Sequence, residues 1–228
     1  MTTFADKVMK FNRALNFKGR LPHGISILNP FRDNPDINFI TELFYRKFYN
    51  DNKKRKIILG INPGRFGAGV TGIPFTDTKR LSEICKIKFE SFSTHELSSV
   101  FIYDMIDKYG GVKKFYNDYY INSVCPLGFV ELNSKGNRIN INYYDNEQLF
   151  RTVKQFIHQS IEKQIEFGID TDVCYILGSK NAEVFKKINA DKKYFGSIVS
   201  LHHPRYISQY KLKSKDKYIS EYLQKLKG

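Results

Sequence analysis

Three short segments of the chain carry residue types that could bind and activate a polar ligand. GINPGRFGAGVTGIPF at 60–75 surrounds Asn62 with five glycines and two prolines, so its backbone can approach a ligand closely and keep a fixed shape. NSVCPLGF at 122–129 begins with an asparagine, and HHPRY at 202–206 places two histidines before a proline. Amides can orient water or a base edge, and a histidine can donate a hydrogen bond to developing negative charge.

The glycine-rich segment does not match the known phosphate-binding patterns. It has neither the GxxxxGK[ST] phosphate loop nor the GxGxxG spacing of a dinucleotide fingerprint, which disfavours a nucleotide cofactor or a small-molecule nucleotide-binding protein. On its own, the segment is either a ligand loop or a structural turn.

Short β-rich runs precede or contain these segments. They lie at 57–60, 121–130, 173–178 and 197–201 and are separated by probable helices, an alternation that predicts a mostly parallel α/β sheet. Ligands bind such sheets outside the carboxyl ends of the strands. The three segments follow or end strands, so we expect them to meet at that edge.

Apolar spacing predicts the helices around the sheet. Two helices lie near 4–15 and 39–48 with a loop at 20–34 between them, one begins near Asp145 and ends at Gly168, and a last one spans roughly 214–226. No linker or repeat interrupts the pattern, which predicts a single domain over 1–228.

Composition indicates the partner and the compartment. A net charge of +14 favours nucleic acid, although a solvated lysine surface would give the same excess. Cys85, Cys125 and Cys174 are odd in number and widely spaced, which predicts reduced core thiols and no metal site. Without a signal peptide or an apolar run of membrane-spanning length, the chain is expected in the cytoplasm, associated with DNA and not with a membrane.

Together, the three segments resemble the motifs of the single-strand-selective monofunctional uracil-DNA glycosylases and a bacterial sister group, within the uracil-DNA glycosylase superfamily. The early ILNPF at 27–31 is also similar. The matching positions of the first motif are Gly60, Asn62, Pro63, Gly64, Phe66, Gly67, Thr71, Gly72, Pro74 and Phe75. The resemblance implies a three-layer α/β/α sandwich around a short, mostly parallel four-stranded sheet. It also implies a monomeric, cofactor-free enzyme acting on DNA that contains uracil or a modified uracil.

The resemblance also implies roles for individual residues. Asn62 would hold the attacking water and His203 would donate to uracil O2, with His202 as a rival if the motif aligns one residue earlier. Asn122 would read the base edge and separate uracil from cytosine, and Phe75 would stack under the flipped base. Gly60 and Ile61 would complete the base pocket. An amide is a poor general base, so we expect a slower enzyme than relatives with a carboxylate at position 62.

Several expectations concern the rim of this pocket. Gly64 stands where thymine-excluding relatives carry a tyrosine, which predicts that 5-hydroxymethyluracil is accepted. The closing motif is shorter than usual, leaving Arg205 and Tyr206 as candidates for the wedge that fills the vacated base stack. Phosphate contacts are expected from Lys211 and Lys213, the first lysines of the C-terminal stretch, while Arg65 either contacts a phosphate or faces solvent in its loop.

Two alternatives remain open at this point. One is a glycosylase for another deaminated base, hypoxanthine or xanthine, and the other is a non-catalytic module that binds damaged DNA. No lysine lies inside the three motifs, which predicts base removal without strand cleavage. Asp77, Asp104 and Asp107 are expected to cap helices or face solvent.

Overall fold

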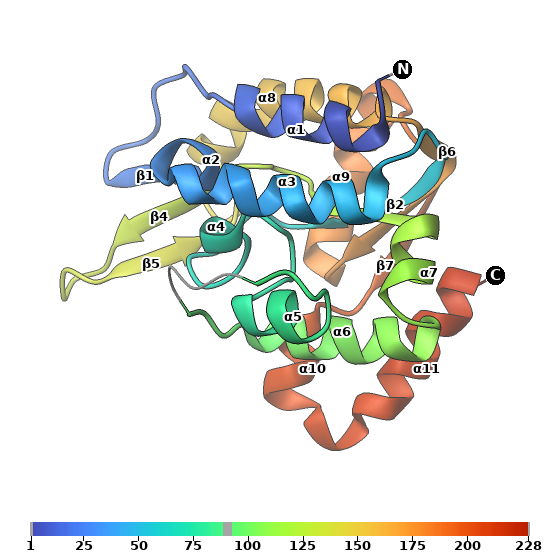
Figure 1. Cartoon of the computed structure of the whole chain (residues 1–228). Helices are drawn as coiled ribbons and strands as arrows, with labels where there is room; N and C mark the ends of the chain where they lie inside the picture. The colour runs from blue at the N-terminus through green and yellow to red at the C-terminus, as the bar shows by residue number, and fades with distance from the viewer. Residues whose placement is uncertain (1, 89–92, 228) are drawn as a thin grey trace.

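The computed structural model describes residues 2–88 and 93–227 and has a parallel four-stranded sheet at its centre (Figure 1). The order is β3 (Tyr119–Ser123), β2 (Arg55–Gly60), β6 (Ile169–Leu177) and β7 (Ser197–Leu201). Neighbours are all parallel, with Ile58 opposite Ile121 on one side and Tyr175 on the other. β2 and β3 are almost wholly buried, as expected for strands covered on both faces. The predicted parallel sheet is confirmed.

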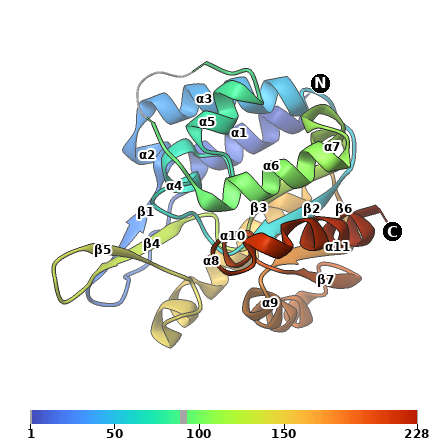
Figure 2. The ribbon, with the colours of Figure 1, turned by 90° about the horizontal axis from the view of Figure 1, so that it is seen from below.

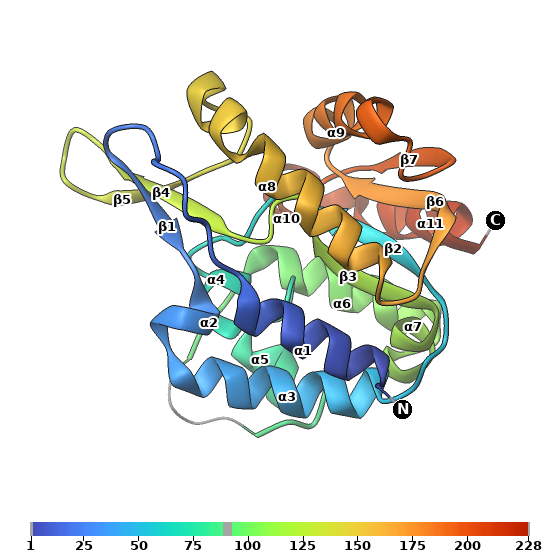
Figure 3. The same cartoon turned by 90° about the horizontal axis from the view of Figure 1, so that it is seen from above.

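Helices cover both faces of the sheet. Figures 1 and 3 show α1 (Phe4–Ala14) and α8 (Glu147–Ile165) on one side. Figures 1 and 2 show α6 (Leu97–Tyr109), α10 (Pro204–Tyr210) and α11 (Lys215–Lys227) on the other. The remaining helical elements are α2 (Pro30–Asp33), α3 (Pro35–Tyr49), α4 (Ala68–Thr71), α5 (Thr78–Glu83), α7 (Val112–Asp118), α9 (Ser179–Lys192) and the 3₁₀ turn η1 (Leu212–Ser214). This three-layer arrangement is the predicted α/β/α sandwich.

A second, antiparallel sheet was not predicted. It has the order β1 (Ile25–Leu28), β4 (Gly128–Leu132), β5 (Arg138–Ile141). The prediction of a loop over 20–34 was therefore wrong, since that range contains β1 and α2. β1 is only four residues long and pairs with β4, so no local apolar pattern marks it.

The run predicted as one strand over 121–130 divides into β3 and β4. The amides of Val124 and Cys125 still donate to Gly60 and Ile61, but Pro126 has no amide proton with which to continue a ladder. Gly128 then lies against the loop after β2, where a Cβ atom would come within 2.3 Å of the Pro63 carbonyl oxygen. β4 leaves the parallel sheet at this glycine and joins β1 and β5.

Helix ends follow capping chemistry. α8 is capped by Asn146, whose side-chain oxygen accepts from the Leu149 amide at 2.9 Å, one residue after the predicted Asp145. Asp145 instead accepts from the Asn142 amide at 2.8 Å. In α11, Ile219, Tyr222 and Leu226 are buried, as predicted. Leu223 is partly buried.

The core is built largely from phenylalanine and tyrosine. At the start of β2, fully buried Arg55 lies 4.9 Å from the Phe4 ring centre and 4.8 Å from that of Tyr49, and it pairs with Asp51 at 2.9 Å. The three cysteines are buried free thiols, as predicted. In the described ranges, no helix has the length and apolar character needed to span a membrane.

Candidate active site

A cavity of about 340 Å³ is lined by residues of all three segments: those that follow β2 and β7, and Ser123 of the segment at 122–129, at the end of β3. Asn62, Phe75 and His203 all line it. Asn62 and His203 are 141 positions apart in the sequence. The parallel sheet brings them together because its strands end at the same edge.

Asn62 is held by the chain that follows β5. Its Oδ1 accepts a hydrogen bond from the Tyr143 amide at 3.0 Å, and its Nδ2 donates to the Ile141 carbonyl at 3.3 Å. These two bonds fix the orientation of the amide and leave one N–H and one oxygen lone pair free. Such a group can bind a water molecule but cannot take its proton.

His203 caps α10 and lies in the cavity. Its Nδ1 accepts from the Arg205 amide at 3.1 Å, so in the neutral ring the proton sits on Nε2. Burial, with a smaller effect from the positive charge of Arg205, lowers the pKa of His203 to about 4. At neutral pH the ring is therefore an uncharged donor.

His202 is placed differently. Its ring is exposed and packs against the rings of Tyr206 and Tyr218, with centroids 6.3 and 5.0 Å away. Its carbonyl accepts a hydrogen bond from the Tyr222 hydroxyl. His202 does not line the cavity, so the geometry favours His203 as the donor.

Phe75 has an unusual backbone conformation. Its φ is +54°, in the left-handed region, where a non-glycine residue is strained. The surrounding loop is tied by buried Thr71, whose hydroxyl donates to the Thr76 carbonyl at 2.7 Å. Gly60 leaves room for the ring, since a Cβ atom there would lie 3.0 Å from it. The centroid of the Phe75 ring lies 6.2 Å from that of the His203 ring, and both residues line the cavity.

Asn122 is adjacent to the cavity wall and does not itself line the cavity. Its Oδ1 accepts from the Ser123 amide at 2.8 Å and its Nδ2 donates to the Tyr120 hydroxyl at 2.7 Å. One N–H and one lone pair remain for a ligand. Ile61 and Ser123 line the cavity directly. The base-reading role of Asn122 stays a prediction.

The residues expected to contact DNA differ in their distance from the cavity. Arg205 and Tyr206 line it, as does Gly64, which was expected in the base pocket. Arg65 lies beside it, with its guanidinium 4.8 Å from the Phe66 ring centre. The side chains of Lys211 and Lys213 are exposed just beyond α10, outside the cavity lining.

Other lining residues were not anticipated from the sequence. They come from β5 and the chain after it, from the start of α6 and from the end of α10: Asn140, Asn142, Glu96, Ser98, Gln209 and Tyr210. None belongs to a recognisable motif, so only the fold brings them to the cavity. A weak signal exists in RININ at 138–142, where Asn140 and Asn142 alternate with isoleucine.

The three aspartates act much as predicted. Asp77 caps α5 through the Arg80 amide at 2.9 Å, and Asp104 pairs with Lys215 at 2.7 Å. Asp107 is exposed. Within 2–88 and 93–227, no cluster of three or more His, Cys, Asp or Glu side chains could hold a metal ion.

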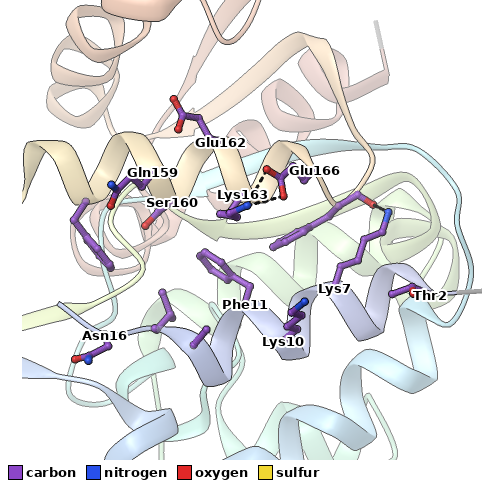
Figure 4. Close-up of a pocket in the computed structure, with 14 residues that line it drawn as sticks. Thr2, Lys7, Lys10, Phe11, Asn16, Gln159, Ser160, Glu162, Lys163 and Glu166 are labelled. Atoms are coloured by element: carbon purple, nitrogen blue, oxygen red, sulfur yellow. Dashed lines mark hydrogen bonds and ion pairs between the residues drawn. The ribbon is translucent and has the colours of Figure 1, made fainter. Parts of the chain in front are cut away.

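A larger cavity, of about 710 Å³, lies between α1 and α8 (Figure 4). Phe11 and Phe167 are among its apolar walls, and Lys7 at its edge donates to the Phe167 carbonyl at 3.3 Å. Lys163 is paired with Glu166 at 3.0 Å. This cavity contains no residue of the three segments.

Two comparisons find proteins that are similar to this chain. A family model described as the Uracil DNA glycosylase superfamily matches residues 46–227. Among solved structures, the chain is similar to wild-type SMUG2 of Pedobacter heparinus, with 51% sequence identity and a TM-score of 0.97. The match covers 100% of this chain and 98% of that chain. No curated protein sequence matches.

Proposed function

The chain belongs to the uracil-DNA glycosylase superfamily and is a DNA glycosylase, and we propose that it removes uracil and 5-hydroxymethyluracil from DNA by hydrolysis. A base inside a duplex cannot reach a cavity of this kind, so it must be flipped out or met in a single strand. The face of the Phe75 ring would support the base, at a stacking gain of roughly 1–3 kcal/mol.

The position and charge state of His203 carry the proposal. Breaking the N-glycosidic bond leaves negative charge on the departing uracil. The Nε2 proton of a neutral imidazole, held in place through Nδ1, can donate to O2 as that charge develops. Asn62, fixed by Ile141 and Tyr143 in the same cavity, would orient the attacking water.

Two further features support a simple hydrolysis and a broad pocket. Among the described residues that line the cavity there is no lysine, so no amine is available for a lyase reaction. A Cβ atom on Gly64 would lie 3.3 Å from Nδ2 of Asn140, so the glycine leaves open the space that a side chain would fill. We propose that this space accepts substituents at C5 of uracil. We also propose that the protein acts as a monomer on DNA in the cytoplasm, at the nucleoid.

The test is a panel of labelled oligonucleotides that each contain one uracil, 5-hydroxymethyluracil, hypoxanthine or xanthine, in single strands and in duplexes. Release of uracil and 5-hydroxymethyluracil, detected as alkali-dependent strand cleavage, is the expected result. Exclusive release of the purine bases would contradict the proposal and support the other substrate class.

A further inference from the structure

Glu96 is a carboxyl group in the active-site cavity that the three motifs do not include. It stands immediately before α6, and it lines the same cavity as Asn62 and His203. Its Oε2 is shielded from solvent and has no hydrogen-bond partner among the described residues. A buried carboxylate oxygen without a donor is costly, which indicates that its partner is a bound ligand or water.

The position of this carboxyl is fixed from two sides. On one side, it lies against Gly67, where a Cβ atom would come within 2.3 Å of Oε2. On the other side, the Glu96 amide donates to Oδ2 of buried Asp77 at 3.0 Å, and that oxygen also accepts from the Ser99 hydroxyl at 2.7 Å. Asp77 thus anchors the start of α6 and places a second negative charge nearby.

Glu96 differs chemically from the other ionisable side chains that line the cavity. The Nδ1 of His203 already accepts from the Arg205 amide, and burial lowers the pKa of His203 to about 4. Arg205 carries a guanidinium, and Tyr206 and Tyr210 carry phenols. Among the described lining residues, Glu96 is the one carboxyl group.

The charges around Glu96 adjust its pKa for accepting a proton near neutral pH. Burial and the neighbouring Asp77 raise the pKa of Glu96 to about 7, while Arg205 opposes the shift. Asp77 itself pairs with Arg80 at 3.1 Å, and exposed His95 lies 3.7 Å from it. A general base is most effective when its pKa lies close to the working pH.

We propose that Glu96 is a catalytic residue that accepts the proton of the attacking water, supplying the base that an asparagine at position 62 lacks. The water oxygen bonds to C1′ while the C1′–N1 bond breaks, and the electron pair of that bond leaves with the uracil. The water proton passes to the Glu96 carboxylate and from there to solvent. This inference rests on the proposed hydrolysis of uracil in DNA.

The test compares single-turnover uracil release by the wild-type protein and Glu96→Gln between pH 5.5 and 9. The wild-type rate should rise about tenfold per pH unit below 7 and level off above it, as a single essential base requires. Glu96→Gln should be about a hundredfold slower at pH 8, with no inflection near 7 and with little difference from wild type at pH 5.5. Glu183→Gln, at an exposed pair with Lys180 on α9, is the matched control and should behave as wild type.

Binding of an oligonucleotide with 2′-fluoro-deoxyuridine, which resists cleavage, separates catalysis from affinity and should be equal in both proteins. Equal rates or equal pH profiles for the wild type and Glu96→Gln would overturn the inference. So would an affinity for this analogue that weakens with rising pH in the wild type but not in Glu96→Gln. That result would make Glu96 a protonated contact to a phosphate. A wild-type protein that releases no uracil at any pH would refute the proposed function instead.

Discussion

Replacing His203 removes two distinct interactions, and the structure allows their effects to be separated. His203 lines the cavity, and we propose that its Nε2 proton donates to the departing base; loss of one such donor to developing charge costs roughly 2.7–4 kcal/mol, or 10²–10³ in rate. The Nδ1 atom caps α10 through the Arg205 amide, and loss of a cap costs roughly 0.5–2 kcal/mol of folding stability. His203→Ala should therefore lose both activity and stability.

His203→Asn provides the matched comparison, because its shorter side chain keeps a capping oxygen and loses the donor in the cavity. The assay is single-turnover uracil release at pH 7.5 together with urea unfolding. Both variants should be slowed to a similar degree, and only His203→Ala should unfold at lower urea. His202→Ala, which alters an exposed ring outside the cavity, should stay within a few-fold of wild type. A larger rate loss in His202→Ala than in His203→Ala would refute the assignment.

Three further results are expected. Gly64→Ala should lower the rate on 5-hydroxymethyluracil about tenfold more than on uracil, because the added methyl group would enter the space that we propose lies beside C5; equal losses in the two single-turnover rates would contradict this. Replacing Lys211 and Lys213 by alanine should reduce the slope of log affinity against log salt by about 2, while Lys187→Ala on α9 should not change it; an unchanged slope in the double variant would place both lysines off the DNA. Because the pKa of Glu96 is raised in the folded state, the contribution of Glu96 to stability should be lost as pH rises from about 4.5 through 7. In urea unfolding, the stability of Glu96→Gln relative to the wild type should therefore increase by up to about 3 kcal/mol between pH 4 and pH 8. A pH-independent difference between the two proteins would contradict the pKa shift.

The pH dependence of His203 has the opposite sign. Its folded pKa is below that of an unfolded histidine, so its contribution to stability is complete above about 6.5 and is lost as pH falls toward 4. Because the ring stays neutral above pH 5, its titration does not overlap the inflection near 7 expected from Glu96. The two groups can therefore be distinguished in one series of uracil-release rates measured against pH.

The parts of the fold that local pattern controls were predictable. Short apolar, β-rich runs marked β2, β6 and β7, and parallel strands bring their following loops together. This is why Asn62 and His203 could be placed in one site from the sequence. The apolar pattern predicted one strand where β3 and β4 are separate, because it does not reveal that Gly128 lies against the Pro63 carbonyl.

The rest of the site depends on tertiary contacts that leave no local signal. β1 and β5 are four residues each and are stabilised only by pairing with β4, so their short segments resemble loops. Asn140 reaches the cavity because β5 folds back beside the glycine-rich loop, where its Oδ1 accepts from the Arg65 amide at 3.1 Å. Glu96 reaches the cavity only because the tertiary fold places its carboxyl group against Gly67. In the sequence it is one glutamate among many surface charges.

The most direct test of the account is single-turnover release of uracil from an oligonucleotide with one deoxyuridine, single-stranded and duplex, by the wild-type protein and by Asn62→Ala in the presence of a metal chelator. The account predicts alkali-dependent cleavage that persists with the chelator and falls by at least about a hundredfold in Asn62→Ala, because the ordered water is lost. Undiminished release by Asn62→Ala, or no release by the wild-type protein on either substrate, would contradict it.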